Sequence, residues 1–179
     1  MNSSFDADGV ENGHVNRSPL TPTPLIPIGM GRVRATGWLE GQLRRQAEGL
    51  TGHAEAVLPE IGPDNGWRGG DGENWEKGPY YLRGLVSLAF VLDDPELKAR
   101  ARQWIDAILV AQREDGQIGP DSNPDWWPRM VICWTMRDYF EASGDPRIIP
   151  ALMRYARYLA ANIEAHPCSN GHAPGWRTR

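Results

Sequence analysis

Residues 79–109 read PYYLRGLVSLAFVLDDPELKARARQWIDAIL, and this stretch decides the fold class. Its apolar residues recur every three or four positions, which is the spacing of one face of an α-helix. Asp94-Pro95 interrupts the pattern with a capping carboxylate, followed by a proline suited to the first position of a new helix. The stretch therefore predicts two consecutive amphipathic helices joined by a short turn.

The same arrangement occurs again 51 residues further along, where Asp145-Pro146 corresponds to Asp94-Pro95 and Tyr155 corresponds to Trp104. Helix–Asp-Pro–helix is thus a repeated unit of about 50 residues. A hairpin of amphipathic helices cannot bury its apolar face alone, so such units stack on their neighbours in an open solenoid or a closed toroid. Because two units complete neither architecture, we expect some apolar helix faces to be left uncovered.

We predict four antiparallel helices between residues 79 and 163, with breaks near Asp94, at 116–124 and at 144–145, and no strand. A further helix is expected to begin near Thr36, whose hydroxyl can cap it. Its apolar stripe would comprise Trp38, Leu39, Leu43, Ala47 and Leu50. Residues 1–28 are dense in proline and predict a flexible arm, and 167–179 predict an irregular tail.

Composition argues against several function classes. The 179 residues carry a net charge of −4 with a pI near 5.6, so no basic surface for nucleic acid or an anionic membrane is expected. The sequence contains no membrane-length apolar run and no secretory leader, which predicts a cytoplasmic protein. Cys133 and Cys168 do not form a disulfide framework, and Cys168 with His166 and His172 lacks the four ligands of a structural zinc site. We expect no metal ligand in this chain.

Two segments, 69–81 and 115–129, precede the first helix of each repeat and combine carboxylates, amides and tryptophans. Carboxylates and amides bind sugar hydroxyls, and aromatic rings stack on the apolar faces of sugars. The alternative is purely structural, with tryptophans closing the core and Asp71 or Asp125 capping the following helices; residue types alone weigh the two equally. If the helices stack as hairpins, both segments reach one end of the assembly. The candidate sugar-binding residues are Asp71, Glu73, Asn74, Trp75, Glu76, Asp125, Trp126, Trp127 and Arg129.

Several motifs in these segments resemble a known family. They are GDGENWE at 70–76, GPYYLRGL at 78–85, QREDG at 112–116, DWWPRM at 125–130 and the Gly-Asp-Pro helix start at 144–146. Together they resemble the amino-terminal part of the beta-L-arabinofuranosidase-like proteins, glycoside hydrolase family 127. The resemblance extends over roughly residues 27–163.

The resemblance implies that residues 29–166 are part of a catalytic domain with an (α/α)6 barrel, about its first third. Characterised members release terminal beta-L-arabinofuranose with a zinc-bound cysteine nucleophile and a glutamate acid/base, all in later motifs. No catalytic or metal residue is therefore carried over, and zinc is expected only in a complete enzyme. The family's sugar-binding His-Glu-Leu-Tyr segment is replaced here by Trp126-Trp127-Pro128-Arg129, which leaves the sugar open.

Two functions follow as hypotheses. The first is a fragment of a glycoside hydrolase that carries part of the sugar-binding wall and is inactive alone. The alternative is a non-catalytic helical-repeat protein that binds a carbohydrate or protein partner.

Overall fold

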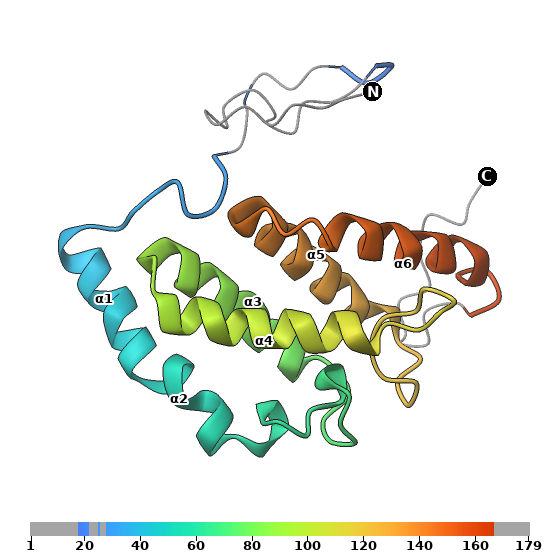
Figure 1. Cartoon of the computed structure of the whole chain (residues 1–179), viewed down its shortest axis with the longest axis horizontal. Helices are drawn as coiled ribbons and strands as arrows, with labels where there is room; N and C mark the ends of the chain where they lie inside the picture. Colours follow the sequence, from blue (N-terminus) through green and yellow to red (C-terminus); the bar gives the residue numbers. More distant parts are fainter. Residues whose placement is uncertain (1–17, 22–24, 26–27, 167–179) are drawn as a thin grey trace, which may run out of the picture.

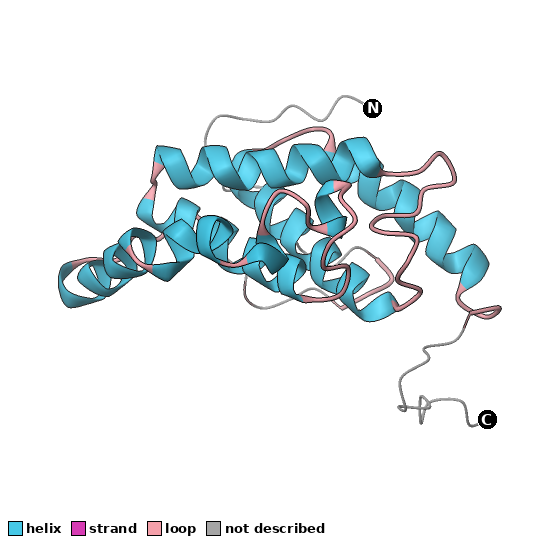
Figure 2. Ribbon diagram, turned by 90° about the horizontal axis from the view of Figure 1, so that it is seen from below, coloured by secondary structure: helices cyan, strands magenta, loops and turns pink. Residues whose placement is uncertain are grey.

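A computed structural model describes residues 18–21, 25 and 28–166, so most of the predicted 1–28 arm and the 167–179 tail, with Cys168 and His172, lie outside the described residues. Within them the chain is all-helical and contains no strand, as predicted (Figures 1 and 2). The helices are α1 (Gly37–Glu48), α2 (Leu50–Val57), the 3-10 helices η1 (Pro59–Ile61) and η2 (Gly66–Arg68), α3 (Lys77–Leu92), α4 (Pro95–Ala111), α5 (Trp126–Ser143) and α6 (Ile148–Asn162).

The two repeated hairpins, α3–α4 and α5–α6, confirm the four predicted helices and their breaks. Asp94 caps α4 as expected, because its carboxylate accepts the N–H groups of Glu96 and Leu97 at 3.0 Å each. The second Asp-Pro behaves differently. Asp145 accepts the N–H of Arg147 at 3.0 Å, but α6 begins only at Ile148 and has no side-chain cap. The Asp-Pro pair thus marks a helix start in one hairpin and the preceding turn in the other.

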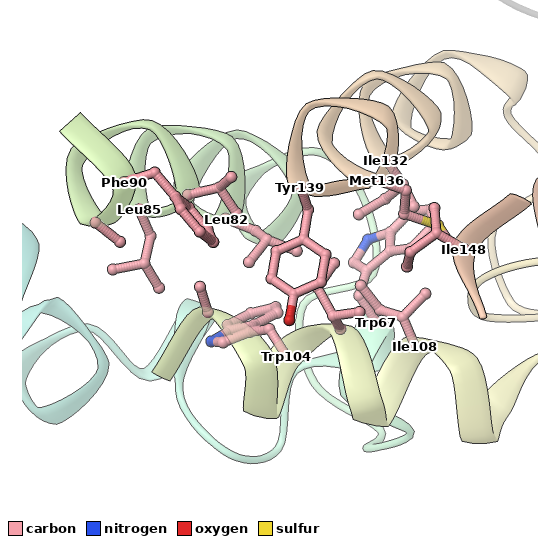
Figure 3. Packing of buried hydrophobic residues seen from close by; sticks show 14 of the residues in the cluster. Trp67, Leu82, Leu85, Phe90, Trp104, Ile108, Ile132, Met136, Tyr139 and Ile148 are labelled. Carbon is pink, nitrogen blue, oxygen red and sulfur yellow. The ribbon is translucent and has the colours of Figure 1, made fainter. Parts of the chain in front are cut away.

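The core lies where the two hairpins meet. Helix α3 packs against both α4 and α5, and α6 packs against α5. Trp104 of α4 and Trp67 of η2 are almost completely buried in this core. Figure 3 shows Ile108 of α4 in the same cluster as Met136 of α5 and Ile148 of α6. The hairpins are therefore held together mainly by burial of apolar side chains, the dominant favourable contribution to folding.

The amino-terminal helix is only partly as predicted. Thr36 occupies the capping position of α1, but its side chain makes no capping hydrogen bond, which corrects the expected cap. Leu43 and Ala47 pack against the core, whereas Trp38 is 79% exposed, and α1 buries no residue fully. Leu50, the last residue of the predicted apolar stripe, belongs to α2, because Gly49 separates α1 from α2.

A polar cluster around Glu55 attaches α2 to the hairpins. The Glu55 carboxylate forms an ion pair with Arg68 at 2.8 Å and accepts hydrogen bonds from Tyr81 Oη at 3.2 Å and Trp104 Nε1 at 3.1 Å. Burial and the neighbouring Glu55 charge raise the pKa of Tyr81 to about 12, so its hydroxyl stays a donor at neutral pH. Among the described residues no helix is long and apolar enough to cross a membrane.

Candidate functional site

The loop that precedes α3 is folded around a buried asparagine. Asn65 accepts the N–H of Trp67 through Oδ1 at 2.9 Å, and its Nδ2 donates to the Glu60 carbonyl at 2.6 Å and to Glu73 Oε2 at 3.2 Å. Gly78 passes so close that a Cβ there would lie 2.8 Å from the Asn65 side chain. The loop is therefore held by internal hydrogen bonds and by close packing.

Glu73 caps α3 from inside this loop. Its Oε1 accepts the N–H groups of Trp75 at 3.0 Å and Lys77 at 3.3 Å, and its Oε2 accepts the N–H of Gly78 at 3.4 Å. Both oxygens are thus occupied by backbone donors at a helix N-terminus, where negative charge is favoured. The sequence interpretation placed both Glu73 and Asp71 among the candidate sugar contacts and named Asp71 as a cap only in the structural alternative; in the structure the residue that caps α3 is Glu73. Asp71 itself is exposed, and its N–H donates to Asp64 Oδ1 at 3.3 Å.

Arg129 organises the loop that precedes α5. Its guanidinium is buried and donates to the carbonyls of Ile118 at 2.9 Å, Pro120 at 3.0 Å and Asp125 at 2.7 Å. Asp125 in turn caps α5 by accepting the N–H of Trp127 at 2.9 Å. Because the head group of Arg129 lies inside the protein, we remove Arg129 from the candidate sugar contacts and assign it to loop structure.

The three predicted tryptophans have different environments. Trp126 is 7% exposed, donates its indole N–H to the His166 carbonyl at 2.6 Å and packs against Tyr158, so it fits the structural alternative. Trp75 and Trp127 are 45% and 44% exposed. Those two rings therefore keep a face that a ligand can reach.

The two loops meet, as predicted, at the end of the helices away from the α3–α4 turn (Figure 1). Asn123 Nδ2 donates to the Asn74 carbonyl at 2.7 Å, and Asn74 Nδ2 donates to Ser122 Oγ at 2.8 Å. Asn74 is thus used to join the loops.

Each half-exposed tryptophan is bound by the opposite loop. Trp75 Nε1 lies 3.4 Å from Asp125 Oδ2, and Trp127 Nε1 lies 3.2 Å from Glu76 Oε2. The pairing is reciprocal, since each loop supplies one indole donor and one carboxylate acceptor. Two tryptophans and two carboxylates from separate repeats therefore converge on one part of the surface.

Three residues that the sequence interpretation missed extend this surface. Trp134 lies edge-on to Trp127 with ring centroids 5.9 Å apart, and the Arg83 guanidinium lies 5.2 Å from the Trp134 ring centroid. Tyr80, one turn after Glu76, is 44% exposed. The spacing of seven residues between Trp127 and Trp134 places both on one helix face and could have identified Trp134. We call Trp75, Tyr80, Trp127 and Trp134 the aromatic face.

Trp67 supports the aromatic face from beneath. It is buried, and its Nε1 donates to the Trp75 carbonyl at 2.8 Å. Gly119 of the second loop rests on its ring, because a Cβ there would lie 2.3 Å from a ring carbon. Trp67 therefore contacts both loops and fixes their spacing, although no spacing rule in the sequence points to it.

A pocket of about 460 Å³ lies away from the two loops, between α2, η1 and α3. Sugar binding at the two loops stays a prediction. In the described part of the chain no three His, Cys, Asp or Glu side chains are grouped as metal ligands. No family model, curated protein or solved structure matches this chain. The family assignment therefore stays a resemblance based on the motifs at 70–85 and 112–146.

Proposed function

We propose that this chain supplies part of the sugar-binding wall of a glycoside hydrolase, with the two hairpins as part of an incomplete (α/α)6 barrel. The observation that carries the proposal is the reciprocal pairing of Trp75 with Asp125 and of Trp127 with Glu76. It produces two half-exposed indole rings of fixed orientation beside two carboxylates.

This combination suits a sugar for physical reasons. A sugar has an apolar C–H face that packs on an aromatic ring and a rim of hydroxyls that need acceptors. A carboxylate has acceptor sites on two oxygens, so the hydrogen bond of Glu76 to the Trp127 indole leaves capacity for a sugar hydroxyl. Asp125 is buried and also caps α5, so its part is to hold the Trp75 ring. Rings already held in place lose less conformational entropy on binding than free side chains, which favours affinity.

Catalysis is assigned to no residue of this chain. By resemblance, the cysteine nucleophile, the glutamate acid/base and the zinc ion belong to other motifs of a complete enzyme. The described residues form no metal-ligand group, so no step of this proposal passes through zinc. We expect the chain alone to bind sugar without hydrolysing it.

Calorimetry with a panel of methyl furanosides and pyranosides, L-arabinofuranosides included, tests the proposal. Trp127→Ala should weaken binding of the preferred sugar by about twofold to tenfold, since an aromatic contact contributes roughly 0.5–1.5 kcal/mol. Trp38→Ala is the matched control, because Trp38 is 79% exposed on α1, away from the two loops. No binding of any sugar, or equal weakening by both substitutions, would overturn the proposal.

A further inference from the structure

The aromatic face continues along the exposed sides of α3 and α5. Glu76, Tyr80 and Arg83 are spaced by four and three residues, so they follow one side of α3 from its start. Trp127 and Trp134 lie on one side of α5 in the same way. The Trp127 indole binds Glu76, and the Arg83 guanidinium lies over the Trp134 ring. The two helix sides therefore form one surface.

Arg83 is the cation of this surface, and its hydrogen-bond donors are unused. Its side chain is 40% exposed, and its Nε lies 3.9 Å from Asp138 Oδ2, beyond hydrogen-bond distance. Its guanidinium carbon lies 5.2 Å from the Trp134 ring centroid, a cation–π contact that holds the group in place. Within the described residues the Arg83 side chain makes no hydrogen bond. The donors of a positioned guanidinium are thus available to a ligand.

The neighbouring Asp138 is already bound by another arginine. Arg137 donates to Asp138 Oδ1 from Nη2 at 2.6 Å and from Nε at 3.1 Å. These hydrogen bonds raise the pKa of Arg137 above its usual value. Asp138 therefore takes its short contacts from Arg137, and its distant pairing with Arg83 does not use up the Arg83 guanidinium.

The contacts on this surface run in order from Glu76 to Trp127, Trp134 and Arg83. The ring centroids of Trp127 and Trp134 are 5.9 Å apart, so the Arg83 guanidinium lies within about 11 Å of the Trp127 ring. Glu76 and Arg83 are seven residues apart, which corresponds to about 10 Å along α3. The surface thus has an acceptor at one end, a cation at the other end and aromatic rings between them.

A neutral sugar would use the acceptor and the rings but not the cation. The planar guanidinium of arginine matches the two oxygens of a carboxylate and binds them with parallel hydrogen bonds. A phosphate fits less well, because it carries close to two negative charges and Glu76 already places one carboxylate on the same surface. A sugar with a single negative charge on a carboxylate therefore suits this surface best.

We propose that the sugar bound at the aromatic face is a uronic acid. Its carboxylate pairs with Arg83, its ring packs on Trp127, and one of its hydroxyls donates to Glu76. Arg83 then determines specificity and has no part in catalysis. This inference rests on the proposed function, since it names the class of sugar that the same surface binds.

Calorimetry at low ionic strength tests the inference with two matched pairs of ligands, methyl glucuronide with methyl glucoside and methyl galacturonide with methyl galactoside. The members of each pair differ only in whether the exocyclic group is a carboxylate or a hydroxymethyl. In at least one pair the wild type should bind the uronide about fivefold to tenfold more tightly, because hydrogen bonds between charged groups are the stronger ones. Added salt should reduce this preference, since it screens a half-exposed ion pair.

Three variants separate the Arg83 contact from net charge. Arg83→Gln should abolish the preference for the uronide and change the affinity for the neutral partner by less than about twofold. Arg83→Lys should keep part of the preference, because lysine keeps the charge but not the paired donors. Arg102→Gln is the control, since it removes the same charge from α4 at a side chain that is 67% exposed. Circular dichroism verifies that each variant is folded.

The outcomes distinguish this inference from the proposed function. Equal binding of uronide and neutral partner, or binding of neutral sugars alone, would overturn the inference and leave sugar binding intact. The inference also fails if Arg83→Gln keeps the preference, or if Arg102→Gln reduces it as much as Arg83→Gln does. If no sugar binds at all, neutral or acidic, the proposed function fails and the inference fails with it.

Discussion

Replacing Arg129 with methionine should strongly destabilise the protein. The substitution keeps an unbranched apolar stem but removes the guanidinium that donates to the carbonyls of Ile118, Pro120 and Asp125 at 2.7–3.0 Å. Arg129 is 1% exposed, so these carbonyls lose donors that water cannot readily replace. A buried polar group that loses its donor costs roughly 1–3 kcal/mol. The Pro120 carbonyl keeps the N–H of Asn123 at 3.3 Å, so the other two carbonyls give a total of about 2–6 kcal/mol.

Urea denaturation followed by circular dichroism measures this loss as a lower midpoint with an unchanged m-value. Arg102→Met is the control. The Arg102 side chain is 67% exposed and its ion pair with Asp106 is long, with 3.7 Å between Nε and Oδ2, so its removal should cost less than about 0.5 kcal/mol. A loss below about 1 kcal/mol for Arg129→Met would refute the assignment of Arg129 to loop structure.

Three further results are expected. Glu73→Ala should lower the free energy of unfolding by about 1–2 kcal/mol in urea titrations, because α3 loses its cap. In a Cys168→Ser variant, Ellman's reagent at pH 8 should not label Cys133 until the protein unfolds, since burial raises the pKa of that thiol to about 12 and almost no thiolate forms. Arg147 lowers the pKa of Asp145 below its usual 3.8, so this stabilisation is complete above pH 3.8 and is lost as the pH falls through the lower folded value. Acid titrations should therefore show a smaller loss of stability below pH 4 for Asp145→Asn than for the wild type.

The helices could be predicted because their signals are local. The apolar spacing in 79–109 and the proline after Asp94 act within one or two turns, and α3 and α4 follow them. The Asp145-Pro146 pair predicts a helix start by the same local signal, but α6 begins later, at Ile148. Asp145 fulfils only the local requirement, whereas its ion pair with Arg147 and the long-range pair of Arg147 with Asp106 depend on the packed structure.

The site could be located but its residues could not be assigned roles. Sequence order predicts that both loops reach one end, because each precedes the first helix of a hairpin. It does not distinguish Glu73, whose oxygens cap α3, from Glu76, which binds the indole of Trp127. Nor does it separate buried Trp126 from half-exposed Trp127, since adjacent helical residues face directions about 100° apart and only the packing decides which is inward.

The binding of sugar by the aromatic face is tested most directly by the indole N–H resonances of the protein labelled with ¹⁵N-tryptophan. The chain has eight tryptophans, and replacing each in turn with phenylalanine assigns their signals. Titration with the methyl glycoside that binds best should shift the signals of Trp75 and Trp127 while those of exposed Trp38 and buried Trp104 stay in place. Unmoved Trp75 and Trp127 signals at saturating sugar, with shifts confined to other tryptophans, would contradict the proposal.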